Sequence, residues 1–206
     1  MIESACKARA GHNTQPWLFK IGASEIDIYP DFSKELPIVD PSHRELFVSL
    51  GCATENLCIA AHEKGYHTEV KVIENSFIRV LLTAGKEKLT FSLLFPQIAV
   101  RQTNKRVYNG EAIPERTINL LKMVPIEPSV SIHFYRNGTV DYDTIAGWVY
   151  AGNRLQMNDE AFKTELTDWM RYNKKQQDNT RDGLSYATFG APNIPLFMAK
   201  FIMSKL

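Results

Sequence analysis

Residues 11–29, GHNTQPWLFKIGASEIDIY, join a polar loop to two apolar runs that are separated by a turn. Trp17–Ile21 has the composition of a strand, and Ile26–Tyr29 alternates apolar and polar residues with a period of two. Gly22–Ser24, between the two runs, is a turn signal. The spacing therefore predicts a β-hairpin at this point of the chain.

A long helix is predicted downstream of the hairpin, after a loop at 30–42 that contains three prolines. Ser42 and Glu45 form a capping-box pattern, which makes Ser42 the expected N-cap. The helix is expected from Glu45 to His62, and Gly65 is the expected residue just beyond its end. Its periodic apolar positions are Leu46, Leu50, Ala53, Leu57, Ala60 and Ala61. Because Phe47, Val48 and Ile59 make the opposite side apolar as well, burial on most sides is expected.

The rest of the chain alternates between strand-like and helix-like patterns. Further strands are expected at Val70–Ile73, Ile78–Thr83, Leu89–Phe95 and Val130–Tyr135. Further helices are expected at 97–104, at 115–123 after Pro114, over 141–177 with a break near Gly152-Asn153, and at 194–204. Hairpins are more frequent than βαβ units, so the sequence predicts an α+β fold with a mainly antiparallel sheet flanked by helices.

Composition excludes several classes of protein. The chain has 206 residues, 44% of them apolar, and a formal net charge of +1. This apolar content excludes a disordered chain, and the charge balance argues against a nucleic-acid partner. No apolar run is long enough to span a membrane, and the first residues lack the apolar segment of a secretory signal. A cytoplasmic protein is therefore expected.

Cysteine and histidine give no sign of a metal centre. Cys6, Cys52 and Cys58 form no CxxC pair, and their odd number favours a reducing compartment over a disulfide framework. All three are expected to be small buried apolar residues. The five histidines are scattered without the spacing of metal ligands, so no metal site is predicted. The motifs of nucleotide-binding loops, serine hydrolases and zinc proteases are also absent from the sequence.

Two segments carry chemistry that suits a bound cofactor. Gly11–Phe19 offers amides and a hydroxyl for the polar edge of a flat heterocycle, and Gly11 would allow a close approach of the backbone. The alternative is an ordinary loop between a helix and a strand. In Arg101–Arg106, an extended backbone would project Arg101, Thr103 and Lys105 to one side, where they suit a terminal phosphate. The alternative for that segment is a solvated basic turn.

These segments resemble motifs of the nitroreductase family. The stretch ARAGHNTQPWLF at 8–19 is similar to the family's signature loop, and Arg101-x-Thr103-x-Lys105 is similar to its phosphate clamp. Residues 50–66 resemble its central helix. Residues 29–41, 165–169 and 181–184 are similar to the branch with two tandem modules, which includes the Acg-like proteins. The resemblance covers most of the chain.

The resemblance implies an FMN-binding protein of nitroreductase-like fold, which would accept electrons from NAD(P)H. Arg101 and Lys105 would neutralise the FMN phosphate, and Thr103 would donate a hydroxyl hydrogen bond to it. Ala10, Gly11 and Asn13 would line the isoalloxazine, and Gln15 would support their loop. The resemblance names no catalytic side chain, because the flavin carries the chemistry.

The resemblance to the nitroreductase family also implies that the chain is divided into two modules. Residues 1–96 would form one nitroreductase-like module without its first helix, and residues 97–206 would form part of a second. The chain would then be a truncated member of the tandem branch, with one well-furnished flavin site. That site would lie between the two modules of one chain, as an intrachain pseudo-dimer, or between two chains of a homodimer.

The expected function is transfer of electrons from NAD(P)H through FMN to a nitroaromatic, a quinone or a similar small acceptor. The alternative is a protein of the same fold that binds or sequesters FMN without catalysis. A third possibility is that the motif matches are accidental in an α+β domain. Neither a nucleic acid nor a membrane is an expected partner.

Overall fold

The computed structural model describes residues 1–74, 76–85, 93–195 and 197–198. The chain divides into two units. The first comprises Met1–Lys105 and Thr164–Leu206, and the second comprises Arg106–Lys163. These spatial units are not the predicted modules 1–96 and 97–206, which stay a prediction about how the chain is built.

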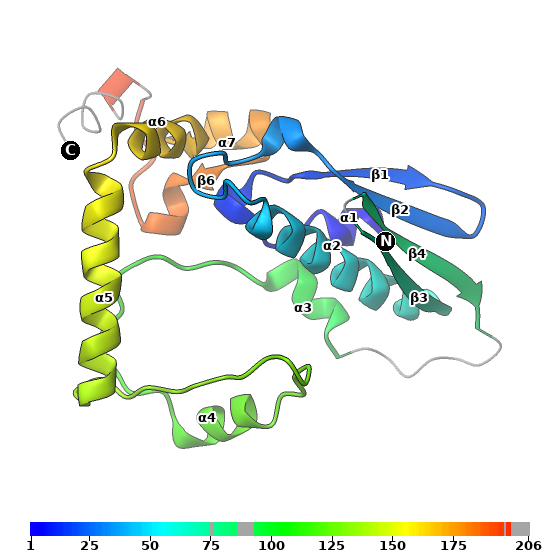
Figure 1. The fold of residues 1–206 in the computed structure, drawn as a ribbon, viewed down its shortest axis with the longest axis horizontal. Coiled ribbons are helices and arrows are strands. Elements are labelled where there is room, and N and C mark those ends of the chain that lie inside the picture. The colour runs from blue at the N-terminus through cyan, green and yellow to red at the C-terminus, as the bar shows by residue number, and fades with distance from the viewer. Residues whose placement is uncertain (75, 86–92, 196, 199–206) are drawn as a thin grey trace. The chain divides into compact units, whose positions relative to one another are not determined.

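The first unit contains a four-stranded antiparallel sheet (Figure 1). Its strands are β1 (Trp17–Ile21), β2 (Glu25–Pro30), β3 (Tyr66–Ile73) and β4 (Phe77–Ala84), in the order β1-β2-β4-β3. The predicted hairpin is confirmed, because β1 pairs with β2 from Trp17 opposite Pro30 to Ile21 opposite Ile26. Together with the helices around it, this sheet confirms the α+β class.

An ion pair between a buried aspartate and a partly exposed arginine joins two of the strands. Asp27 of β2 lies opposite Arg79 of β4. Arg79 donates from Nε and Nη2 to the two carboxylate oxygens of Asp27, at 2.7 and 2.8 Å. These hydrogen bonds hold the pKa of Asp27 below its ordinary value, although burial opposes ionisation. A slip of one residue would move Asp27 out of reach of Arg79, so the pair favours the observed register.

The long helix α2 (Arg44–Glu63) crosses one face of this sheet (Figure 1). Its predicted bounds are confirmed to within one residue at each end, and Gly65 follows with a φ of +82°. All six of its predicted periodic apolar residues are buried. The core between helix and sheet includes Leu50, Leu57, Ile28 and Val80, all essentially inaccessible to solvent.

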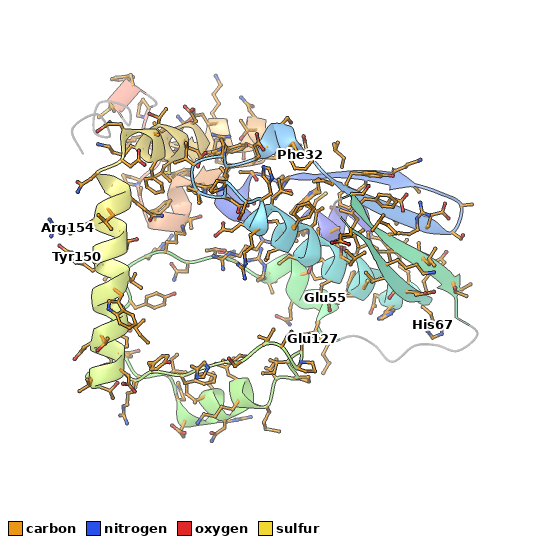
Figure 2. The ribbon with its side chains drawn as sticks, viewed as in Figure 1. Phe32, Glu55, His67, Glu127, Tyr150 and Arg154 are labelled. Atoms are coloured by element: carbon orange, nitrogen blue, oxygen red, sulfur yellow. The ribbon has the colours of Figure 1, made fainter. Side chains whose placement is uncertain are left out.

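The start of α2 differs from the prediction. Its N-cap is His43, at a φ of +58°, and no side chain of the cap residue bonds to the first turn. Instead, Asp40 Oδ2 accepts a hydrogen bond from the backbone N–H of Leu46 at 2.9 Å. The His43 ring bonds to Glu35 at 2.7 Å and packs against the ring of Phe32, which Figure 2 labels. The expected N-cap at Ser42 is therefore wrong, because a carboxylate further upstream supplies the capping acceptor.

Two expectations about burial are also wrong. Phe47 and Val48 of α2 are 38% and 53% exposed, since the helix packs on the sheet with one face only. Ile59 is half-buried. Among the cysteines, Cys58 is buried and Cys6 is partly buried, but Cys52 on the outer side of α2 is exposed.

Short elements complete the first unit. Its helices are α1 (Ile2–Ala5), α3 (Phe95–Val100) and α7 (Lys174–Thr180), with 3-10 turns at Gly11–Asn13, Phe32–Lys34 and Tyr186–Phe189. A short parallel pair joins β5 (Met170–Arg171) to β6 (Leu184–Ser185). Most of α6 (Glu160–Trp169) also belongs to this unit.

The second unit contains α4 (Glu115–Lys122) and α5 (Val140–Met157). The helix after Pro114 is confirmed. Tyr150 and Arg154, four residues apart on α5, carry side chains that Figure 2 labels. None of the residues of α4 or α5 is buried.

Several predicted elements differ or lie outside the described residues. Val130–Tyr135 is not a strand, because it has no hydrogen-bonded partner strand among the described residues. The break predicted near Gly152-Asn153 is wrong, because helix α5 continues through both residues. The helix ends at Met157, and Asn158 is its C-cap. Most of the strand expected at Leu89–Phe95 and of the helix expected at 194–204 lies outside the described residues; Phe95 itself begins α3.

The buried position of Leu50 gives a test of this core. Leu50→Ala is expected to lower the free energy of unfolding by about 2–5 kcal/mol, because it removes buried methyl groups and leaves a cavity. Val72→Ala is the control: Val72 is 73% exposed, and a change within about 0.5 kcal/mol is expected. Urea unfolding measures both, and similar losses in the two variants would contradict the described packing.

Candidate functional site

The polar loop singled out in the sequence has a strained backbone. It begins with the 3-10 turn Gly11–Asn13, and three of its residues other than glycine have positive φ angles. The values are +46° for His12, +53° for Asn13 and +58° for Gln15. Each such residue costs on the order of 1–3 kcal/mol and persists only where its surroundings hold it. Residues of this kind cluster at binding sites, so the loop is a candidate site.

A segment far along the chain holds the loop. Asn13 Nδ2 donates to the carbonyl of Gly183 at 3.1 Å, and the Gly183 N–H donates to the carbonyl of Asn13 at 2.9 Å. Within the loop, Gln15 Nε2 donates to Asn13 Oδ1 at 2.9 Å. The side chain of Asn13 therefore ties the loop to Gly183 through its amide nitrogen and to Gln15 through its amide oxygen.

Glycine is required at position 183. Its φ is +81°, which disfavours any residue with a Cβ. A Cβ built there would lie 2.5 Å from the backbone oxygen of Trp169 and 2.8 Å from the guanidinium of Arg171. The absence of a side chain thus lets the backbone of this segment approach both the Asn13 loop and residues 169–171.

An ion cluster anchors Gly183 from the preceding residue. Asp182 is buried, and its carboxylate accepts from Lys34 Nζ at 2.8 Å and from Arg171 Nη2 at 2.7 Å. Burial opposes its ionisation, but the hydrogen bonds from Lys34 and Arg171 hold the pKa of Asp182 below its ordinary value. The indole of Trp169 lies near both cations, 5.4 Å from Lys34 and 5.5 Å from Arg171.

A second carboxylate joins the same two segments. The Glu165 carboxylate accepts hydrogen bonds from the backbone N–H groups of Ile38 and Val39, at 2.9 and 3.0 Å. With Lys34, this places the loop between β2 and α2 against residues 165–182. The anchor of Gly183 therefore has two independent attachments to the N-terminal part of the chain.

Gly11 lies where the loop meets α2. Its N–H donates to Ser49 Oγ at 3.3 Å. A Cβ at this position would come within 3.1 Å of a Glu45 carboxylate oxygen and 3.3 Å of Leu36 Cδ1. The residue before it, Ala10, has an extended backbone and is buried.

The basic segment follows α3 and approaches the same part of the chain. Arg101 Nη2 donates to the carbonyl of Lys7 at 3.0 Å. The Lys105 N–H donates to the carbonyl of Thr188 at 3.0 Å, and its ammonium lies 5.4 Å from the Phe189 ring. Thr103 between them is exposed. In the described part of the chain, neither Arg101 nor Lys105 forms a salt bridge with a carboxylate.

His12 connects the loop with the basic segment electrostatically. Burial and the positive charge of Lys105 lower its pKa from the ordinary value of 6.5, and Glu165 and Glu45 offset this only in part. The imidazole is therefore neutral at neutral pH. Lys105 therefore acts on this loop through its charge.

The structure thus brings most of the predicted site residues to one region. Asn13 and Gln15 bond to each other, Gly11 is fixed by α2, and Lys105 acts on the loop through its charge. Arg101 reaches Lys7, three residues before Ala10. Thr103 makes no contact that links it to the loop. Whether these residues bind FMN stays a prediction.

Sequence reasoning missed the residues that hold the loop: Lys34, Arg171, Asp182 and Gly183. The segment at 181–184 was noticed as part of a family resemblance, but nothing local in it indicates a bond to residue 13. The Asp-Gly pair at 182–183, which is typical of a turn, was the available signal, and it does not name the partner of the turn.

The described ranges hold neither a cluster of metal ligands nor a membrane-spanning helix. They contain no group of three or more histidine, cysteine, aspartate or glutamate residues placed to hold a metal ion. None of their helices has the length and apolar character needed to cross a bilayer.

Comparison with known proteins supports a relation to the nitroreductases. The chain is similar to two proteins of Mycobacterium tuberculosis, one from strain CDC 1551 / Oshkosh and one from strain H37Rv, each bearing the name "Putative NAD(P)H nitroreductase". Identity is 25% over 174 residues, which is 82% of this chain and 49% of each relative. The chain therefore spans about half the length of these relatives. No family model matches the chain.

The anchor can be tested by Asp182→Asn. The variant keeps the shape of the side chain but removes the charge that pairs with Lys34 and Arg171, so unfolding is expected to become easier by about 1.5–3 kcal/mol. Asp178→Asn is the matched control, because Asp178 pairs with Lys174 at an exposed position, where such pairs contribute about 0–1 kcal/mol. Urea unfolding should separate the two variants, and equal effects would count against the anchor.

His12 predicts a pH dependence of stability. Because its pKa is lower in the folded chain, the unfolded chain binds the proton more readily below pH 6.5. The contribution of neutral His12 to the free energy of unfolding is fully present above pH 6.5, and it is lost as the pH falls through the lowered pKa of the folded chain.

His12→Asn should therefore flatten the fall in unfolding free energy between pH 7 and pH 5, measured by urea unfolding at each pH. Asparagine also tolerates the positive φ of this position. His67→Asn, at an exposed position of β3, should leave the fall unchanged. Parallel profiles for wild type and His12→Asn would refute the assignment.

Proposed function

We propose that this chain is a nitroreductase-like oxidoreductase that binds FMN and passes electrons from NAD(P)H to a nitroaromatic, a quinone or a similar small acceptor. The observation that carries the proposal is the strained loop at residues 11–15, held by Gly183, together with Arg101 and Lys105, which form no salt bridge with a described carboxylate. The similarity to the two mycobacterial proteins points to the same class.

The donor set suits FMN. A terminal phosphate with two negative charges needs cations that are not already neutralised, and Arg101 and Lys105 form no salt bridge among the described residues. Arg101 uses one of its five N–H donors on Lys7, so four remain for a ligand. The hydroxyl of exposed Thr103 can donate to the same group.

The loop would meet the ring system of the cofactor. Gly11 would line the ring with its backbone, since the space that a side chain there would occupy is taken by Glu45 and Leu36. Gln15 keeps its carbonyl oxygen and one amide hydrogen after bonding to Asn13, so it can bond the polar edge of the ring. Asn13 uses its amide on Gly183 and Gln15, and we assign it the role of holding the loop rather than of reading the ring.

Bound FMN would supply the hydride and electron transfer. The chain's own residues bind and orient: the two cations hold the phosphate, and the strained loop is fixed before any ligand arrives. Neutral His12 can accept or donate a hydrogen bond near the site without adding charge. This assigns the protein the work of positioning, and it requires no nucleophilic side chain.

We further place the chain in the tandem-module, Acg-like branch, with the FMN site formed between two modules of one chain or between two chains. The motifs at 29–41 and 181–184 support this placement. These two segments contact each other in the folded chain, because Lys34 donates a hydrogen bond to Asp182.

Arg101→Ala tests the cofactor assignment. Loss of a charge-assisted hydrogen bond to phosphate is expected to weaken FMN binding by about 1.5–3 kcal/mol, or roughly 10- to 150-fold. Quenching of flavin fluorescence in a titration with the full chain measures this. Arg154→Ala on the exposed surface of α5 is the matched control and should bind FMN as the wild type does. Unchanged affinity in Arg101→Ala would remove the clamp from the proposal.

Anaerobic addition of NADH or NADPH to the FMN-loaded chain separates an enzyme from a flavin-sequestering protein. An oxidoreductase should lose its flavin absorbance and regain it when a nitroaromatic or quinone is added. A yellow protein that neither nicotinamide bleaches would instead be a binding protein of the same fold.

A further inference from the structure

A cavity of about 410 Å³ is lined by both residues of the Asn13–Gly183 contact. Its wall is formed by Asn13, by Gln177 and Asp178 of α7, by residues 181–183 and by Ser185. This volume lies in the range of pockets that bind small molecules. Because Asn13 belongs to both the loop and the cavity wall, a molecule bound here would lie directly against the proposed FMN loop.

The charges around the cavity leave one cation without compensation. Three of the lining residues are charged, namely Asp178, Arg181 and Asp182. Asp178 is paired with Lys174 at 2.8 Å, and Asp182 is paired with Lys34 and Arg171. The side chain of Arg181 forms no hydrogen bond or salt bridge with any described residue. The cations paired with the two carboxylates, Lys174, Lys34 and Arg171, outnumber them, so this group of side chains together with Arg181 carries a net positive charge.

A second donor accompanies this cation. Gln177 Oε1 accepts from Ser185 Oγ at 2.7 Å, and Ser185 Oγ in turn accepts from the N–H of Ala187 at 3.3 Å. This arrangement fixes the orientation of the Gln177 amide and leaves its NH₂ group as a donor. Arg181 and Gln177 together offer hydrogen-bond donors, and the two carboxylates of the wall, Asp178 and Asp182, are already paired with other cations, which leaves these donors for an anion.

The backbone at Arg181 is strained in the same way as the loop. Arg181 is the C-cap of α7 and has a φ of +56°, a position where glycine or asparagine is usual. Strain at a residue with a long charged side chain is a feature of functional positions. Here the strained residue is one that lines the cavity, next to Asp182 and Gly183.

We propose that this cavity binds the anionic group, a carboxylate or a phosphate, of the small molecule that docks against the Asn13 loop, and that Arg181 selects for that charge. The inference rests on the proposed function for the identity of the loop, but its chemistry does not require flavin. Two sources can supply the anion: the carboxylate of an aromatic acceptor, or the pyrophosphate of a nicotinamide dinucleotide.

The experiment measures binding of three probes to the full chain by isothermal titration calorimetry: 4-nitrobenzoate, its neutral counterpart 4-nitrobenzamide, and inorganic pyrophosphate. Each titration is made without flavin and again with saturating FMN, which fills the proposed phosphate clamp. Arg181→Gln is compared with wild type and with Arg154→Gln, a matched substitution at an exposed arginine of α5.

At least one charged probe is expected to bind wild type more tightly than 4-nitrobenzamide does, both with and without FMN. Its affinity should fall about tenfold or more in Arg181→Gln and stay unchanged in Arg154→Gln. Arg181→Lys, which keeps the charge, should retain most of the affinity and so separates loss of charge from loss of folding. If the affinity for 4-nitrobenzoate depends on Arg181, the site is assigned to an acceptor carboxylate. If the affinity for pyrophosphate depends on Arg181, the site is assigned to a dinucleotide.

Equal affinity of the charged probes for wild type and Arg181→Gln would overturn the proposal, as would failure of both charged probes to bind wild type. Failure of FMN to bind would overturn the proposed function instead. Binding of a charged probe through Arg181 would still be measurable in the arm without flavin, so the two failures are distinguishable.

Discussion

Two hydrogen bonds between residues 13 and 183 organise the candidate site. The backbone N–H of Gly183 and the side-chain amide of Asn13 each donate to the other residue's carbonyl, and together they join segments 170 positions apart. The loop at 11–15 has three positive-φ residues and would not keep this form alone. Gly183 can make the contact because it has no side chain, and it stays in place because Asp182 is tied to Lys34 and Arg171. A contact of modest energy thus converts a strained loop into a fixed surface.

Charge is distributed around this contact in a consistent way. At Asp182, the buried carboxylate is paired with two cations, Lys34 and Arg171, so its negative charge is neutralised. Three cations near the loop or its cavity, Arg101, Lys105 and Arg181, form no salt bridge with a carboxylate in the described part of the chain. The chain's net charge of +1 hides this separation. Cationic groups on two sides of one loop are what a site for a phosphate-bearing cofactor and an anionic co-substrate would need.

Local patterns in the sequence predicted the parts of the fold that local forces determine. The hairpin over β1 and β2 and the helix α2 follow from apolar periodicity and turn residues, and the structure has them nearly as predicted. The N-cap was wrong because Asp40, outside the capping-box pattern, reaches the first turn. The strand at 130–135 was wrong because composition alone cannot provide a pairing partner. In the site, the amide loop and the basic segment could be chosen from their chemistry, whereas Lys34, Asp182 and Gly183 could not, since their role depends on contacts across more than a hundred residues.

The central claim is that the loop at 11–15, held by Gly183 next to the basic segment, forms one binding surface for FMN. Backbone amide chemical shifts of the ¹⁵N-labelled full chain, followed during titration with FMN, test it directly. The account predicts that the largest shifts fall on residues 11–15, 101–105 and 182–183 together and saturate with a single binding constant. Shifts confined to other parts of the chain, or no shifts at all, would contradict it.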